Sequence, residues 1–274
     1  MDKFARIMSA DRNGGGPGLP FTPSHMAAVV PLMSSPRVRR FADPWALALG
    51  AMVPDLPIFL PFLPDYGKWH SWVGVVTIDL ASVLLLLPLF HGVFREPLIS
   101  LLPPSLGGRA AVLASSRPQL VPMAVGAVIG AASHVFWDSF THSSGPGEWG
   151  DWLSIRVFGV IRLFRLLQYV SSVIGLAIVL WWGWRGLSRM ADSPVPERLR
   201  VSRRVRGLVM LLCSIGTIAG AFLWPLVDEP APELGIPSVL TKTGAGTLIG
   251  LCLVLTCYAT VWQVRQRMAL SEGA

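Results

Sequence analysis

The segment QLVPMAVGAVIGAASHVFWDSFTH, residues Gln119–His142, is apolar over most of its length and ends in three ionisable residues. It is long enough to cross a bilayer, which takes about 20 residues of helix. His134, Asp138 and His142 follow at intervals of four, which places them on one face of that helix. Because ionisable side chains inside a membrane are costly, their default interpretation is a functional site. The segment therefore predicts a membrane protein whose functional site includes these ionisable residues.

Composition supports a membrane protein throughout. The chain of 274 residues is 52% hydrophobic and 14% charged, whereas soluble domains carry about 25% charged residues. We expect an all-α fold, a polytopic integral membrane helix bundle embedded in the lipid bilayer. The net charge of +7 and the pI near 10.0 could suggest nucleic-acid binding. The Lys and Arg residues lie instead in short loops between apolar runs, as they do in membrane proteins, so no nucleic-acid partner is expected.

About six full spans are expected, together with a short N-terminal half-span and an amphipathic helix lying in the membrane interface. The expected spans are residues 44–62, 72–94, 119–140, 170–187, 207–227 and 243–264, and the half-span is 21–33. The amphipathic segment, Trp152–Leu167, carries arginines on one face and apolar residues on the other. That pattern is typical of helices that contact anionic lipid headgroups.

The expected organisation along the chain has five parts. These are a disordered extension (1–18), a membrane domain (19–190), a basic cytoplasmic loop (191–206), a two-helix membrane hairpin (207–264) and a C-terminal tail (265–274). Ser143–Asp151 is expected as a flexible loop with two acids, able to act as a lid.

The distribution of Lys and Arg predicts an orientation. If the first short helix crosses the membrane, 15 of the 23 basic residues fall on one side and 8 on the other. The richer side, with the C-terminus, is expected in the cytoplasm. This places Asp55, His70, His134 and Asp138 toward the non-cytoplasmic face of a bacterial inner membrane. His25 joins them only if the N-terminal end of the first helix lies on that face, and we expect that it does.

A second candidate site lies in the apolar run 44–62, which is broken by Pro54, Pro57 and Pro61 around Asp55. Non-helical backbone at membrane depth is tolerated only where protein or a water-filled cavity satisfies it. Broken helices of this kind often carry binding sites in transporters. The motif VPDLP is therefore expected to face the same site as His134.

Six motifs occur in an order that resembles a known family. They are PFTPSH (Pro20–His25), PDLP (Pro54–Pro57), HS (His70–Ser71), FHGVFREPL (Phe90–Leu98), ASHVFWDSFTH (Ala132–His142) and LQYVSSVIGL (Leu167–Leu176). Over about residues 20–185 the chain resembles an uncharacterised bacterial membrane family called domain-of-unknown-function family 4184.

A more distant likeness is to the membrane-bound metal-dependent hydrolase family. Its pattern has an early His, a Pro-Asp, a His-Ser and a later His-x-x-x-Asp. On this chain the matching residues are His25, Asp55, His70, His134 and Asp138. The chain departs from that pattern with PDLP where the family has a further acid and His, and with Trp-His-Ser where it has Thr-His-Ser. The likeness implies a divalent metal bound by these five residues.

The chemistry of the five side chains leaves two interpretations open. Imidazole and carboxylate suit zinc, manganese or ferrous iron, and Asp138 or Asp55 could act as a general base instead of a ligand. Alternatively, His134 and Asp138 form a polar clasp that joins helices by hydrogen bonds. His70 and Asp55 have the same two interpretations, since an Asp after Pro can also cap a helix.

Four more polar residues are expected around the site without binding the ion themselves, namely Asp79, His142, Gln168 and Ser171. Asp79 would orient a ligating imidazole, or would be a protonated acid bonded to a neighbouring helix. Gln168 and Ser171 would line the cavity or mediate helix packing. His91 is expected at the opposite interface.

The leading functional expectation is a membrane-embedded metal-dependent hydrolase that acts on a lipid-linked phosphate or ester. The alternative is a non-catalytic membrane protein, a small transporter or a scaffold, in which the His and Asp residues form an ion relay or a packing network. The absence of a nucleophilic Ser, Cys or Thr motif and the broken helix favour this alternative.

Overall fold

The computed structural model describes residues 22–60, 62–63, 66–113, 119–230, 232 and 236–272. The expected N-terminal extension, 1–18, lies outside these residues. The first half contains η1 (Thr22–His25), α2 (Met26–Ser34), η2 (Val38–Arg40), α3 (Pro44–Gly50), η3 (Val53–Asp55), α4 (Leu56–Phe59), α5 (Tyr66–Trp69), α6 (Trp72–Gly74), η4 (Val75–Asp79), α7 (Leu80–Leu89), η5 (Phe90–Phe94), α8 (Arg95–Leu101) and α9 (Pro104–Val112). The second half contains α10 (Leu120–Thr141), α11 (Gly145–Trp149), η6 (Asp151–Ser154), β1 (Arg156–Val157), β2 (Ile161–Arg162), α12 (Leu163–Arg189), η7 (Glu197–Leu199), α13 (Arg203–Val227) and α14 (Ile236–Glu272).

The protein is a multi-pass membrane protein of the all-α class, with almost no sheet. Among the residues that the structure describes, five helices are long and apolar enough to cross a bilayer: Trp72–Leu101, Leu120–Thr141, Leu163–Arg189, Arg203–Val227 and Ser238–Ala269. The sixth expected span, 44–62, is not one long helix. It is divided into α3, η3 and α4, because the prolines at 54 and 57 each remove a backbone donor and end the preceding helical turn.

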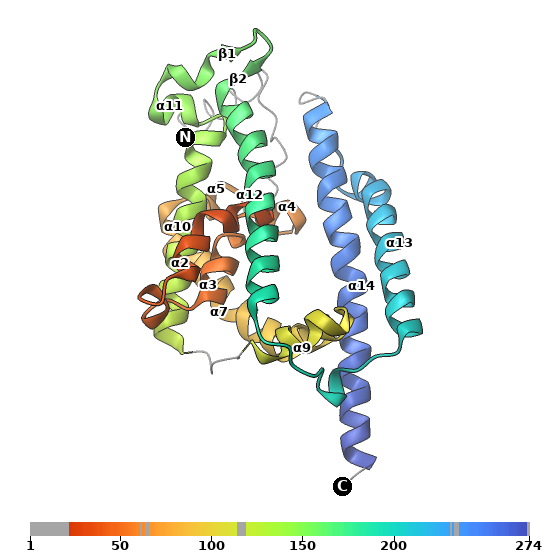
Figure 1. Cartoon of the computed structure of the whole chain (residues 1–274). Helices are drawn as coiled ribbons and strands as arrows, with labels where there is room; N and C mark the ends of the chain where they lie inside the picture. The colour runs from red at the N-terminus through yellow and green to blue at the C-terminus, as the bar shows by residue number, and fades with distance from the viewer. Residues whose placement is uncertain are drawn as a thin grey trace.

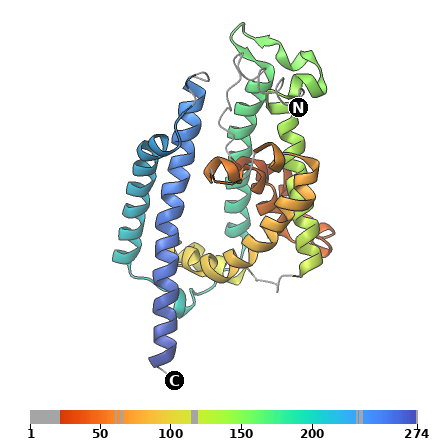
Figure 2. The ribbon, with the colours of Figure 1, turned by 180° about the vertical axis from the view of Figure 1, so that it is seen from behind.

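Two groups of helices are visible in Figures 1 and 2. One group gathers η1, α2, α3, α7, α10 and α12, and the other is the α13–α14 hairpin, which stands beside it. Helix α9 lies between the two groups at one end of the molecule (Figure 1). Helix α14 continues past α13, so the expected C-terminal tail is helical as far as Glu272 (Figure 1).

The core of the first group is the contact between α3 and α10. Asp43 caps α3 by accepting hydrogen bonds from Trp45 N at 2.8 Å and Ala46 N at 2.9 Å. Its own backbone N–H donates to Pro122 O at 2.8 Å, which ties the start of α3 to the first turn of α10. A Cβ on Gly50 would lie 2.5 Å from Ala127 O, so the two helices pack at backbone contact there.

Helix α12 holds the N-terminal helix against this core. Gly175 packs on Ser24, where an added Cβ would lie 2.7 Å from the Ser24 carbonyl oxygen. Farther along, Trp182 Nε1 donates to Ser34 Oγ at 2.9 Å. Helix α12 thus contacts the segment Thr22–Ser34 near both of its ends. The N-terminal end of the segment lies inside the bundle, where His25 is buried.

The expected amphipathic helix over Trp152–Leu167 is wrong. The structure has η6, then a β1–β2 hairpin, and α12 begins at Leu163. Phe158 and Gly159 have φ of 54° and 70°, and two consecutive left-handed residues end any helix and close a tight hairpin. The expected flexible loop before it contains a short helix, α11.

The close packing at Gly130 provides a test of the fold. An added methyl group would collide with the Leu47 carbonyl oxygen and lie 2.8 Å from Ala51 N. We expect Gly130→Ala to cost about 1–3 kcal/mol through overpacking and to lower the melting temperature of the detergent-solubilised protein. Gly183→Ala is the control because nothing lies within 4 Å of its added Cβ, and Ala there should be neutral or stabilising. Equal melting temperatures for the two variants would contradict this packing.

Candidate metal centre

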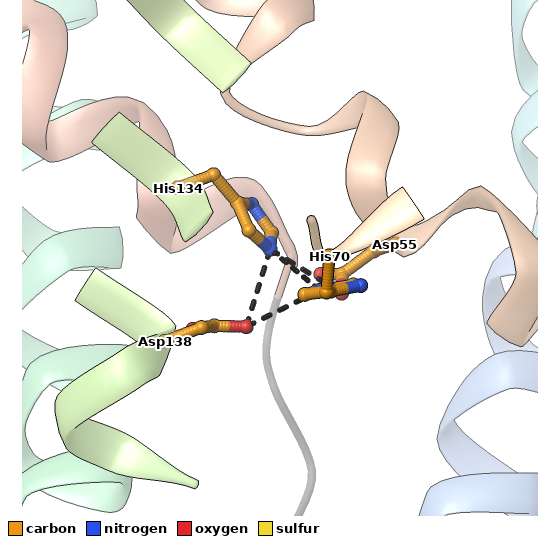
Figure 3. Close-up of side chains that lie close together, drawn as sticks. All are labelled: Asp55, His70, His134 and Asp138. Carbon is orange, nitrogen blue, oxygen red and sulfur yellow. Dashed lines mark hydrogen bonds and ion pairs between the residues drawn. The ribbon is translucent and has the colours of Figure 1, made fainter. Parts of the chain in front are cut away.

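Four side chains from three parts of the chain converge in the first helix group (Figure 3). Asp55 comes from η3, His70 from the link between α5 and α6, and His134 and Asp138 from α10. One ligand atom from each lies within 4.8 Å of the others. Asp55, His134 and Asp138 are buried and His70 is nearly so. We call these four residues the His/Asp cluster.

Helix geometry places His134 and Asp138 one turn apart on α10, as their spacing predicts. Asp55 reaches them because the proline-broken segment turns at η3 instead of continuing as a helix. The segment before α6 is fixed by Ser71, whose Oγ accepts a hydrogen bond from Gly74 N at 2.9 Å and donates to Lys68 O at 2.7 Å. These two hydrogen bonds to the backbone fix the turn that carries His70.

The two histidines have defined tautomers. His134 Nδ1 lies 2.8 Å from the Ala51 carbonyl oxygen, and His70 Nδ1 lies 3.3 Å from the Tyr66 carbonyl oxygen. A carbonyl oxygen only accepts, so each Nδ1 must carry the proton, and the Nε2 of each neutral ring presents a lone pair. These two Nε2 atoms face each other at 3.2 Å. Two lone pairs at that distance repel unless a proton or a cation lies between them.

The spacing of the four ligand atoms suits a single ion. From His70 Nε2, Asp55 Oδ1 lies at 3.5 Å and Asp138 Oδ2 at 3.4 Å. From His134 Nε2, the same two oxygens lie at 3.5 Å and 3.2 Å. Around a tetrahedral zinc ion with bonds of ~2.0–2.1 Å, neighbouring ligand atoms are ~3.3–3.4 Å apart. The donor set and its spacing therefore fit a divalent metal.

Hydroxyl groups orient the two carboxylates. Thr22 Oγ1 donates to Asp55 Oδ2 at 2.7 Å, and Tyr66 Oη approaches Asp55 Oδ1 at 3.4 Å. Thr141 Oγ1 lies 3.4 Å from Asp138 Oδ1. Outer hydrogen bonds of this kind fix metal-binding groups in place. The sequence did not single out these three hydroxyls, although Thr22 lies in the PFTPSH motif and Tyr66 precedes His70 by one helical turn.

His25 lies beside the cluster and not within the group of four. Its ring stacks on His134 with centroids 3.9 Å apart, and its Nε2 lies 3.5 Å from Asp138 Oδ1. Because Asp138 Oδ2 faces His70 and His134, its two oxygens point to different partners. His25 thus contacts the outer oxygen of Asp138 and covers one face of His134.

Of the four residues expected around the site, His142 contacts the cluster directly. His142 Nδ1 is 3.5 Å from Asp138 Oδ2. Asp79 is fully buried, and neither of its oxygens has a hydrogen-bond partner among the residues described. Gln168 Oε1 accepts from Arg165, and Ser171 Oγ accepts from Trp137 Nε1 at 3.2 Å. His91 packs against Trp45, and no contact among the described residues joins it to the cluster.

Burial and charge shape the protonation of the two groups that precede the first span. Burial by itself lowers the pKa of His70, but hydrogen bonds to the Asp138 and Asp55 carboxylates outweigh it and raise the pKa. Burial raises the pKa of Tyr66, and the negative charges of Asp55 and Asp138 raise it further. Tyr66 therefore stays neutral and can donate its proton to Asp55.

Comparison with known proteins gives one match. A family described as Domain of unknown function (DUF4184) matches residues 19–260. This confirms the resemblance drawn from the motifs and extends it through α13 and most of α14. No curated protein and no solved structure matches the chain, and the more distant likeness to hydrolases stays a prediction.

The Thr22 contact provides a test of the site. Thr22→Val keeps the shape of the side chain and removes the donor to Asp55 Oδ2, so we expect zinc affinity to fall by about 10–100-fold. The measurement is competition with a chromophoric chelator at fixed pH. Thr22→Ser retains the hydroxyl and should keep an affinity near that of the wild type. An unchanged affinity for Thr22→Val would show that this hydroxyl does not support the site.

Proposed function

We propose a function for this chain from the premise that it belongs to the DUF4184 family. The proposal is a membrane-embedded, metal-dependent hydrolase whose centre is the His/Asp cluster. The observation that carries it is the pair of opposed Nε2 lone pairs of His70 and His134 at 3.2 Å. A backbone carbonyl accepts from Nδ1 of each ring, which supports a cation between the two Nε2 atoms.

Zinc or manganese would bind at the His/Asp cluster, and either ion would lower the pKa of a bound water toward neutrality. Four protein ligands fill a tetrahedral site, whereas catalytic zinc sites keep one position open. One carboxylate must therefore serve as the base. Asp138 suits this role better than Asp55, because Asp55 is fully buried and accepts from Thr22 at 2.7 Å.

Asp138 has a second oxygen available for moving a proton. Its Oδ1 faces His25 Nε2 at 3.5 Å, so a proton that Asp138 takes from water would pass to this imidazole once it is carried on Oδ1. Of the five residues expected as ligands, His25 is thus assigned to proton transfer and to supporting the ring of His134. The proposed route runs from Asp138 to His25.

The position of the cluster supports a lipid-linked substrate. His134 and Asp138 lie within the last two turns of α10, which ends at Thr141, so the site is near one end of a spanning helix. A lipid-linked phosphate or ester reaches that depth from the leaflet. We propose the bacterial inner membrane as the location, with the C-terminus in the cytoplasm, and anionic lipid headgroups as partners of the segment that precedes α12.

A second candidate function is an ion relay without catalysis. A proton between the two Nε2 atoms would satisfy them as well as a metal does, and Tyr66, Asp55 and His70 form a connected set of polar contacts. The broken helix at η3 favours this candidate, since transporters bind ions at such breaks.

The metal content of the purified protein tests the hydrolase proposal. We expect about one zinc or manganese ion per chain, by elemental mass spectrometry, and loss of that ion in His134→Ala because a ligand is removed. His91→Ala is the control, because His91 packs on Trp45 outside the cluster, and it should retain the ion. Wild-type protein without stoichiometric metal would contradict the proposal.

Hydrolysis separates the two candidate functions. We expect metal-loaded protein in mixed micelles to release phosphate from phosphatidic acid or fatty acid from a phospholipid. Asp138→Asn should slow this release by 10²–10⁴-fold, as expected for loss of a general base. If the protein instead carries proton flux in liposomes, abolished by Asp138→Asn and without bound metal, the relay is the function.

A further inference from the structure

A cavity of about 250 Å³ lies between α2 and α12, at the end of α12 away from the β1–β2 hairpin (Figure 1). One residue from the end of α2 and five from the last turns of α12 line it: Ser34, Trp181, Trp182, Arg185, Gly186 and Arg189. We call this space the basic cavity. Neither the His/Asp cluster nor the segment that precedes α12 contributes to its lining.

Hydrogen bonds join the two helices at the basic cavity. Trp182 Nε1 donates to Ser34 Oγ at 2.9 Å, and Ser34 Oγ donates to Val30 O at 2.8 Å. Arg185 lies over the Trp181 ring, with its Cζ 5.3 Å from the ring centroid. Such a cation–π contact favours one position of the guanidinium group. The cavity is therefore lined by side chains that other contacts hold in place.

The two arginines of the cavity have no anion of their own. Arg185 and Arg189 lie one helical turn apart, a spacing at which like charges repel. Within the described residues, neither guanidinium group forms a hydrogen bond or an ion pair. The acid nearest in sequence, Asp192, is bonded to Arg109, whose Nε lies 2.9 Å from Asp192 Oδ1. The cavity thus presents two positive charges that no described acid neutralises.

The same face of α12 has the order of groups found in a membrane leaflet. Ile174, Ile178, Trp181 and Arg185 follow at intervals of three or four along this spanning helix, so they lie on one face. The two isoleucines and Trp181 are 53%, 39% and 59% exposed. Arg185 lies about 16 Å farther along the axis than Ile174, toward the end of the span. Because tryptophan marks the headgroup level, the isoleucines lie at the depth of acyl chains and the arginines at that of phosphates.

We propose that the basic cavity binds an anionic phospholipid. Arg185 and Arg189 bind the headgroup phosphate together, and an acyl chain lies along Ile174 and Ile178. Guanidinium groups bind phosphate through parallel hydrogen bonds, and a bound phosphate removes the repulsion between the two charges. Basic pockets between spanning helices bind lipid headgroups in this way. The inference does not depend on hydrolysis or on a metal.

A phospholipid is favoured over the other anionic partners by the size of the cavity and by its surroundings. A volume of about 250 Å³ is near the lower limit of small-molecule sites. It suits a headgroup, whereas a protein interface needs about 800 Å² of surface on each partner. A soluble phosphate would bind the arginines without using the exposed isoleucines on the same face. A phospholipid uses both.

Lipid-dependent thermal stability of the full chain tests the proposal. Phosphatidylglycerol added to the detergent-solubilised protein should raise its melting temperature by mass action, whereas phosphatidylcholine and soluble glycerol phosphate should raise it much less. In the double variant Arg185→Gln/Arg189→Gln the apparent affinity for phosphatidylglycerol should fall about 30-fold, since each arginine near an anionic surface contributes roughly a factor of five. Its metal content should equal that of the wild type. Arg265→Gln/Arg267→Gln removes the same charge from exposed positions on α14 and should leave the affinity unchanged.

A second variant blocks the cavity without changing its charge. Gly186 lines the cavity, and nothing lies within 4 Å of a Cβ added there. Gly186→Leu should keep or raise the stability without lipid, because leucine favours a helix more than glycine does, and the filled cavity should abolish the phosphatidylglycerol effect. Gly207→Leu on α13 is the control, because its added Cβ is equally free of neighbours, and it should keep that effect.

Three results would overturn the proposal. Equal losses of affinity in the two arginine pairs would show a general effect of surface charge. Equal effects of phosphatidylglycerol and glycerol phosphate would show a site for soluble anions. An unchanged affinity in Gly186→Leu would show that the lipid binds outside the basic cavity.

Discussion

The site depends on one contact. The Nε2 atoms of His70 and His134 face each other at 3.2 Å, beside the carboxylates of Asp55 and Asp138. In the neutral rings both of these nitrogens present lone pairs. Such an arrangement inside a membrane bundle is unfavourable without a cation, because the two lone pairs repel each other and the two buried negative charges are not neutralised. The protein maintains it by fixing every member through its backbone or a hydroxyl group. The Ala51 carbonyl sets His134, the Tyr66 carbonyl sets His70, and Thr22 sets Asp55.

The fold explains how these contacts are brought together. Gly50 and Gly130 allow α3 and α10 to meet at backbone distance, and only at that distance does the carbonyl of Ala51 reach the ring of His134. The proline-broken segment then turns Asp55 toward α10, while α12 presses the N-terminal helix inward so that His25 stacks on His134. The site is therefore a consequence of helix packing at small residues, a packing mode common in membrane bundles.

Much of this was predictable from the sequence, and the rest depended on three-dimensional contacts. The i, i+4 spacing fixes His134 and Asp138 on one helical face, and the basic loops predict that Asp55, His70 and His25 lie at the same end of the bundle. The carbonyl of Ala51 and the hydroxyls of Thr22 and Tyr66 could not be found, because backbone acceptors carry no sequence signal and isolated hydroxyls are common. The amphipathic helix at Trp152–Leu167 was wrong because its apolar periodicity is real, but Phe158 and Gly159 adopt a left-handed turn that breaks it.

The central claim is that one divalent ion lies between His70, His134, Asp55 and Asp138. X-ray diffraction data from crystals of the purified protein, collected above and below the absorption edges of zinc and manganese, test it directly. The account predicts one anomalous peak about 2.0–2.2 Å from the two Nε2 atoms and from one oxygen of Asp55, with the carboxylate of Asp138 beside the ion as the base. No peak there, with the two Nε2 atoms still facing each other, would contradict the account and leave a proton as the shared cation.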